Sequence, residues 1–181
     1  MEMKELLRNN VEIWKKEILL DDVDIATNAA DNLVKIGGSD IRKFLIELLK
    51  SKDPLVRNKS AIALRELEDN NAIEPLLEAI FKPANKNNNG TLVYALEKMD
   101  CTHKLVELFR ILFYQSYEAK LMACRILDKQ IFEFHRDDLR EIQRMWKKEN
   151  QNTEKVNDFK DEKTYLMMQN AYEGFIEYLK E

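Results

Sequence analysis

A pattern that recurs about every 31 residues constrains the fold of this chain more than any other feature of its sequence. The clearest copy begins Asp53-Pro54-Leu55-Val56-Arg57, and small and apolar residues follow it at helical spacing. A backward shift by 31 positions pairs Asp22 with Asp53, Ile25 with Val56, Ala30 with Ala61, Leu33 with Leu64, Leu45 with Leu76 and Leu49 with Ile80. A weaker copy appears after a forward shift of 32, and a further one begins near Tyr117. Such a period predicts helix pairs that stack and share a continuous core.

Each repeat is expected to be a helix, a turn and a second helix. In the second repeat the apolar spacing predicts a first helix over 54–68, with Asp53 as its N-cap and Pro54 at its first position. The run 69–71, Asp-Asn-Asn, is typical of a turn, and a second helix is expected over 72–81. Ala61 provides a short side chain where two helix axes cross closely, and Leu64 is expected in the core.

The predicted fold class is all-α, with a single domain over residues 1–181. The domain is divided into an N-terminal capping helix over 1–20, repeats over 21–52, 53–89, 90–116 and 117–149, a polar linker over 150–163 and a C-terminal helix over 164–181. The C-terminal helix either caps the stack or is offered to a groove elsewhere. An ordinary helical bundle with accidental internal similarity is the alternative, and it would have the same secondary structure.

The residues from Asp53 to Arg57, followed by Ala61, Leu64 and a second helix with Leu76, resemble a HEAT repeat. The closest variety is the short repeat of bacterial HEAT-like proteins and phycobilin lyase subunits. The resemblance implies a short right-handed α-solenoid of about four helix pairs. It also implies that Asp53 caps its helix and that Arg57 ties neighbouring repeats together. The first repeat has Ala26 at the position of Arg57, and the third repeat lacks both residues.

Composition narrows the function classes. Hydrophobic residues make up 45% of the chain and charged residues 34%, which excludes a disordered chain, and the 4 Gly and 3 Pro leave few turns for hairpins. The net charge of −4 argues against broad nucleic-acid binding. No apolar run is long enough for a membrane span or a signal peptide, and Cys101 and Cys124 form no disulfide framework. We therefore expect a cytoplasmic protein without membrane contact.

No group of residues in the sequence points to a reaction. The pairs Cys101 with His103 and Cys124 with His135 lack the paired short spacings of a zinc site. A Cys–His nucleophile would need an orienting third group, and no Gly-rich phosphate loop is present. We expect no catalytic residue, no metal ligand and no cofactor.

Two groups of residues are candidates for contacting a partner. The first combines Arg with aromatic residues, and the second is a basic helix face with a Trp beside it; the candidates are Arg110, Tyr114, Tyr117, Arg140, Arg144, Trp146 and Lys147. The basic face has an alternative reading as a solvated surface that complements a helix C-terminus. The aromatic group has an alternative reading as a helix buried under the last repeat. The Asn-rich run over 82–90 is interpreted as a solvated loop.

The function favoured by these observations is a non-catalytic module that binds an unidentified protein or peptide on the curved face of the stack. The alternative is an enzyme on the same fold, either a DNA glycosylase for alkylated bases or a chromophore lyase subunit. A glycosylase needs a basic groove, whereas the second helices mix Glu47, Glu74 and Glu78 with Lys43 and Lys50. The lyase reading needs a chromophore partner, which the sequence does not identify.

Overall fold

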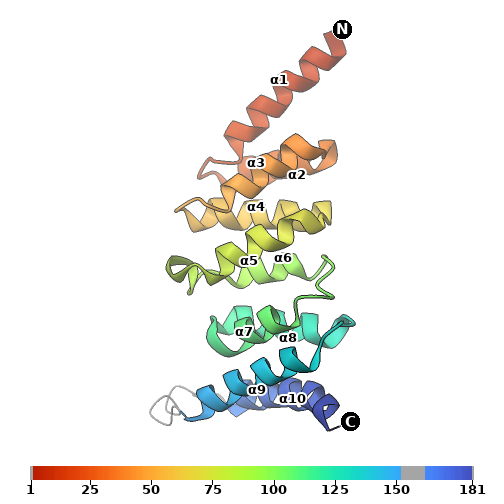
Figure 1. Ribbon diagram of the computed structural model, residues 1–181. Coiled ribbons are helices and arrows are strands. Elements are labelled where there is room, and N and C mark those ends of the chain that lie inside the picture. The colour runs from red at the N-terminus through yellow and green to blue at the C-terminus, as the bar shows by residue number, and fades with distance from the viewer. Residues whose placement is uncertain (1, 152–161, 181) are drawn as a thin grey trace.

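The computed structural model describes residues 2–151 and 162–180, and within these ranges every regular element is a helix (Figure 1). The α-helices are α1 Glu2–Glu17, α2 Val23–Ile36, α3 Ser39–Leu48, α4 Pro54–Leu67, α5 Ile73–Phe81, α6 Gly90–Leu96, α7 Leu105–Tyr114, α8 Tyr117–Lys129, α9 Arg136–Gln151 and α10 Glu162–Ile176. Short 3-10 turns are η1 Asn70–Ala72, η2 Pro83–Asn85 and η4 Glu177–Leu179. The all-helical prediction is confirmed for this part of the chain. None of these helices has an apolar stretch of the length that crosses a lipid bilayer.

The helices begin where the repeat pattern places its acidic caps. The Asp22 carboxylate accepts a hydrogen bond from the backbone N–H of Ile25 over 3.0 Å, and α2 follows. The Asp53 carboxylate accepts from the N–H of Leu55 over 2.8 Å, and α4 follows with Pro54 in its first turn. Each carboxylate satisfies one of the free N–H groups at a helix start. Gly37 and Gly38 join α2 to α3 with φ angles of 61° and 88°, a conformation that favours glycine.

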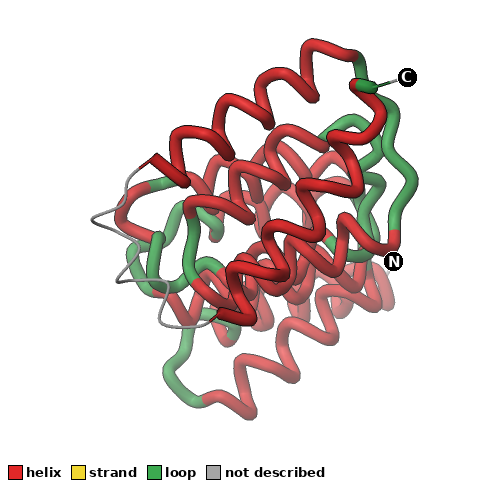
Figure 2. Tube along the Cα trace, turned by 90° about the horizontal axis from the view of Figure 1, so that it is seen from below, coloured by secondary structure: helices red, strands yellow, loops and turns green. Residues whose placement is uncertain are grey.

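The helices stack in two layers along one axis (Figure 1). The first helices α2, α4, α6 and α8 contact one another in sequence, and α10 follows α8. The second helices α3, α5, α7 and α9 form the other layer, and α3, α5 and α7 each pack against the first helix of the next repeat. The view along the stack shows successive helices lying behind one another (Figure 2). The architecture is a stack of helix pairs, and its handedness and curvature remain predictions.

Small residues let the first helices approach each other. Ala30 and Ala61 are 7% and 0% exposed, and Leu33 and Leu64, one turn later, are both fully buried. A short side chain at the crossing point keeps the two helix axes close together, so the neighbouring Leu side chains fill the remaining space. Ser60, also buried, donates a hydrogen bond to the carbonyl oxygen of Leu45 and so connects α4 to α3.

The two ends of the stack are closed by different side chains. At the N-terminal end, α1 packs on the core with Val11 and Trp14, and Ile18, the residue that follows α1, is buried. Met3 and Leu6 on the same helix are 83% and 62% exposed. At the other end, α10 packs on α8 and α9 and carries an aromatic cluster described below. Of the predicted polar linker over 150–163, residues 152–161 lie outside the described residues. The prediction is wrong at its two ends, because 150–151 belong to α9 and 162–163 to α10.

The Asn-rich segment between α5 and α6 differs from its prediction. It was expected to be a solvated loop, but Asn85 and Asn89 are 3% and 0% exposed. The Asn85 side-chain amide donates to the carbonyl oxygen of Ala79 over 2.8 Å. That carbonyl lies near the end of α5, where backbone oxygens lack partners within the helix. The prediction is therefore wrong for these two residues, which form part of the packed interior.

Candidate functional site

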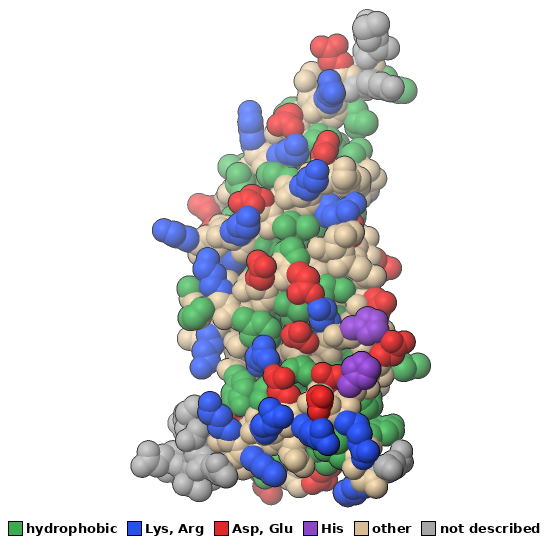
Figure 3. All heavy atoms as spheres, in the orientation of Figure 1, with side chains coloured by type: hydrophobic (Ala, Val, Ile, Leu, Met, Phe, Trp, Pro, Cys, Tyr) green, Lys and Arg blue, Asp and Glu red, His purple; other side chains and the backbone are tan. Residues whose placement is uncertain are grey.

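The second helices α3, α5, α7 and α9 present the face on which the candidate residues mainly lie. Outward positions on this face are charged or aromatic in every repeat, with Glu74 on α5, Arg110 and Tyr114 on α7, and Arg140 on α9. Ion pairs connect some of them between helices, including Lys104 with Glu74. The space-filling view shows acidic and basic side chains mixed over the upper helices and a row of Lys and Arg at the lower end (Figure 3).

A hollow of about 460 Å³ interrupts this charged face between α3 and α5. Its lining is Ile46, Leu49, Lys50, Pro75, Glu78, Ala79, Phe81 and Lys82. The apolar residues form the walls, and Lys50, Glu78 and Lys82 stand at the rim. Lys50 pairs with Glu47 over 2.6 Å, and that hydrogen bond raises the pKa of the lysine. The hollow therefore offers apolar surface surrounded by fixed charges.

Arg110 and Tyr114 join α7 to α9. Arg110 Nη2 lies 2.9 Å from Glu141 Oε1, and its guanidinium lies 5.8 Å from the centroid of the Phe81 ring. The Tyr114 hydroxyl donates to the carbonyl oxygen of Met145 over 3.2 Å, and burial raises the pKa of this phenol. Both predicted residues therefore belong to this face, where they also hold two successive second helices together.

A continuous basic surface lies on α9, and we name it the α9 stripe. It consists of the predicted residues Arg140, Arg144 and Lys147, together with Lys148. All four residues are exposed. Arg140 Nη1 lies 2.8 Å from Asp137 Oδ1 in an exposed pair. The other three cations have no acidic partner among the residues that the structure describes. The row of basic side chains at the lower end of Figure 3 lies over α9.

Trp146 and Tyr117 lie apart from this surface. Trp146 is 8% exposed and stacks on Tyr172 of α10, with ring centroids 5.0 Å apart and planes inclined by 21°. It also lies 5.4 Å from the Phe113 ring, so it supports α9 from beneath and is not open to a partner in this structure. Tyr117 is 51% exposed at the start of α8, in the layer of first helices.

The four predicted structural residues lie where repeats two and one meet. Arg57 is 3% exposed, and its Nη1 donates to the carbonyl oxygens of Ser51 and Lys52 over 2.9 and 3.0 Å. These carbonyls end the first repeat, so Arg57 bridges two repeats. Asp53 caps α4 as described, and Ala61 and Leu64 are fully buried.

A small polar pocket of about 280 Å³ lies beside the first turns of α7 and α9. It is lined by His103, Leu105, Val106, Glu107, Arg110, Glu133, Asp138 and Glu141. Two of its four carboxylates already have structural roles, because Glu141 pairs with Arg110 and Asp138 accepts from the backbone N–H of His135 over 2.7 Å. In the described ranges, no three His, Cys, Asp or Glu residues are grouped in a way that could hold a metal ion.

The two cysteines are poorly placed for nucleophilic chemistry. Burial raises the pKa of the Cys101 thiol to about 12 and that of the Cys124 thiol to about 11. A thiol of so high a pKa carries little thiolate at neutral pH, and the thiolate is the reactive form. Cys101 is fully buried, and its Sγ lies 3.7 Å from the carbonyl oxygen of Leu96.

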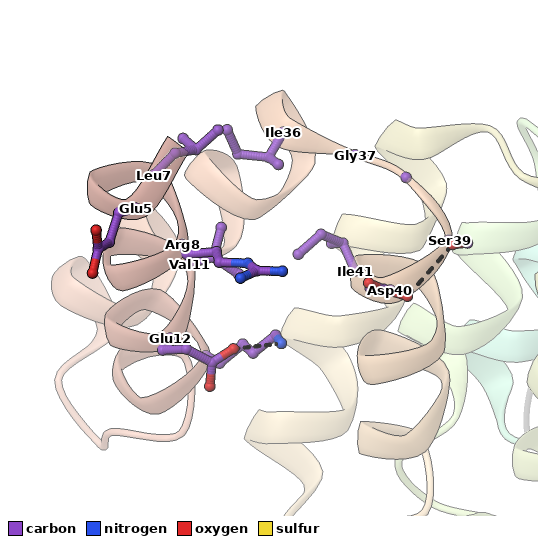
Figure 4. A pocket seen from close by; sticks show the side chains of 12 residues that line it. Glu5, Leu7, Arg8, Val11, Glu12, Ile36, Gly37, Ser39, Asp40 and Ile41 are labelled. Carbon is purple, nitrogen blue, oxygen red and sulfur yellow. Dashed lines mark hydrogen bonds and ion pairs between the residues drawn. The ribbon is translucent and has the colours of Figure 1, made fainter. Parts of the chain in front are cut away.

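A further pocket lies away from this face, between α1 and the turn that joins α2 to α3 (Figure 4). It has a volume of about 730 Å³, and its lining comprises Glu5, Leu7, Arg8, Val11, Glu12, Lys15, Ile36, Gly37, Gly38, Ser39, Asp40 and Ile41. Arg8 and Val11 of α1 point across it toward Ile41. Glu12 and Lys15 pair with each other over 2.8 Å.

Sequence reasoning missed the hollow between α3 and α5. Ile46, Leu49 and Phe81 follow helical spacing, so the pattern assigns them to the core without showing which core residues border open space. The one signal in the sequence is Pro75, an apolar ring in the first turn of the second helix.

The comparisons with known proteins support the repeat architecture. A family model described as HEAT repeats matches residues 16–97, which extend from the last turn of α1 to the residue that follows α6. No curated protein matches the chain.

Proposed function

We propose, from the premise that this chain is a HEAT-like repeat protein, that it binds another protein or a peptide on the face of α3, α5, α7 and α9. Stacked helix pairs form extended surfaces that suit such binding, and HEAT repeats are commonly interaction scaffolds. In this proposal the module holds its partner and performs no reaction on it.

The hollow between α3 and α5 carries the proposal. An apolar side chain of a partner that enters it would leave water and contact Ile46, Leu49 and Phe81. Lys50 and Lys82 at the rim would remain hydrated or meet polar groups of the partner. An apolar centre inside a polar rim is the usual arrangement of a protein-binding surface, and buried central anchors supply most of the binding energy.

The proposal is tested by affinity capture from the native cell with matched variants. Ile46→Glu places a carboxylate in the hollow, and Lys82→Glu reverses a charge at its rim. Ile62→Glu is the control, because Ile62 is 39% exposed on α4, in the layer of first helices. Thermal unfolding of each variant shows whether it remains folded.

We expect the natural chain and the Ile62→Glu control to capture one or more proteins that neither hollow variant captures. The proposal is wrong if all four chains retain the same proteins. It is also wrong if the control loses them as fully as the folded hollow variants do.

A further inference from the structure

We infer that the α9 stripe, Arg140, Arg144, Lys147 and Lys148, binds an acidic segment of the partner protein. This inference rests on the proposed function and names the chemistry of one part of the same face. The stripe is a concentration of positive charge on a chain whose net charge is −4. Its occupant is therefore identified by charge complementarity, which favours carboxylates.

The stripe is not explained by the stability of its own helix. Cations stabilise the last turn of a helix by complementing the dipole, and of the stripe residues Lys148 lies in that turn. Arg140 and Arg144 lie earlier, where the effect of the dipole has fallen off. Arg140 with Arg144, and Arg144 with Lys148, are also like charges four positions apart, an arrangement that is unfavourable in a helix.

The helix that carries the stripe is firmly held. Leu139, Ile142 and Trp146 on its inner side are 1%, 0% and 8% exposed. On one flank, Glu141 and the carbonyl of Met145 bind Arg110 and Tyr114 of α7. Because the backbone beneath the cations is already fixed, binding orders little besides the cationic side chains themselves.

The dimensions and surroundings of the stripe favour a peptide over nucleic acid. From Arg140 to Lys148 the helix rises about 12 Å, which suits a few consecutive residues of an acidic peptide. On the side of α7 the basic surface does not continue, because Glu107 lies there and the one cation, Arg110, is paired with Glu141. A nucleic-acid strand needs a positive track that continues along its phosphates, whereas a short acidic segment needs only the stripe.

The test uses a fluorescein-labelled peptide of alternating Glu and Ala, and fluorescence anisotropy with the full chain. A peptide with Gln in place of every Glu is its neutral match. We expect the chain to bind the Glu peptide more tightly than the Gln peptide. The affinity for the Glu peptide should fall as the salt concentration is raised.

Two double variants with the same change in net charge locate the binding. Arg144→Glu with Lys147→Glu reverses two of the four stripe cations, whereas Lys16→Glu with Lys35→Glu reverses exposed cations on α1 and α2. We expect the stripe variant to bind the Glu peptide about tenfold more weakly or worse, and the control to change less than about twofold. Circular dichroism establishes that both variants keep their helices.

Three results would overturn the inference. The first is no binding of the Glu peptide, and the second is an equal loss in both double variants. The third is tighter binding of a single-stranded DNA oligonucleotide that the stripe variant loses, which would assign the stripe to phosphates. The two proposals can fail separately. If one of these results occurs and Ile46→Glu still abolishes capture of the partner, the proposed function stands. Only the inference that the stripe binds an acidic segment is then rejected.

Discussion

Asn89 and Ser116 hydrogen-bond to each other through their side chains, with the Ser116 hydroxyl donating to Asn89 Oδ1 over 2.7 Å. Each residue immediately precedes a first helix, α6 for Asn89 and α8 for Ser116. The Asn89 amide also donates to the carbonyl oxygen of Ile80 over 3.3 Å and to Gln115 Oε1 over 2.8 Å. One fully buried side chain therefore connects the second repeat to two adjacent residues at the end of the third repeat.

Replacing Asn89 should destabilise the fold substantially. Asn89→Ala removes three hydrogen bonds and leaves the Ile80 carbonyl and the Ser116 hydroxyl short of a partner in a buried place, so we expect a loss of about 2–3 kcal/mol. Asn88→Ala, one residue earlier and exposed, is the control and should change stability by less than about 0.5 kcal/mol. Urea unfolding measures both, and equal effects would contradict the role given to Asn89.

Gly90→Ala and Gly174→Ala should change stability in opposite directions. A Cβ at Gly90 would lie 2.6 Å from the Cβ of Glu118, so α6 and α8 would have to move apart, at a cost of about 1–3 kcal/mol. At Gly174, inside α10, a Cβ meets no atom within 4 Å, and Ala should stabilise the helix by about 0.5–1 kcal/mol. Thermal unfolding measured side by side decides this. A gain at Gly90 would show that α6 does not approach α8 so closely.

Leu64→Ala should cost about 2–5 kcal/mol, the range for truncating a fully buried leucine. Ile62→Ala on the same helix should cost less than about 1 kcal/mol, since that side chain is 39% exposed. Chemical denaturation of the two variants compares the inner and outer sides of α4. Similar losses would mean that α4 is rotated about its axis relative to the structure described.

Glu97 should make stability depend on pH below neutrality. It lies 2.6 Å from Lys129, 3.1 Å from Arg125 and 3.6 Å from Arg65, and thus connects α4, α6 and α8. The hydrogen bond from Lys129 is the main cause that holds the pKa of this carboxyl below its usual value. A lowered carboxyl pKa stabilises the folded chain above the unfolded value of about 4.3. That contribution is lost as the pH falls through the lower folded value.

Glu97→Gln removes this contribution, so the natural chain should exceed the variant in stability at neutral pH. The excess should shrink between about pH 5 and about pH 2. Urea unfolding of both chains at a series of pH values measures this difference in stability. Glu66 and Asp100 also have lowered pKa values, but both chains contain them, so subtracting one stability from the other leaves the contribution of Glu97. A difference that does not vary with pH would show that the ion pairs contribute nothing to folding.

The repeat could be predicted because its constraints are local. Asp22 and Asp53 cap helices through their own neighbours, and Ala30 and Ala61 recur because a short side chain lets neighbouring first helices cross closely. The positions of Leu33 and Leu64 follow one turn later. A period in the sequence therefore corresponds directly to a period in space, and the family match over residues 16–97 falls on the clearest copies.

The remaining features depend on contacts between residues far apart in the chain. The residues around Asn89 have the composition of a solvated loop. Its burial depends on hydrogen bonds with Gln115 and Ser116, more than twenty positions away. Trp146 lies in a basic segment, and its burial follows from Tyr172 of α10. The hollow between α3 and α5 depends on the distance between these two helices. The spacing of apolar residues along either helix does not specify that distance.

The stack carries its two tryptophans at opposite ends, Trp14 on α1 and Trp146 on α9. Because these are the only indoles of the chain, each end has its own intrinsic fluorophore. Trp146→Phe leaves emission from the N-terminal end alone, and Trp14→Phe leaves emission from the C-terminal end. Comparing the denaturation midpoints of the two single-tryptophan proteins would reveal whether a linear array of this kind melts as one unit or frays from one terminus first.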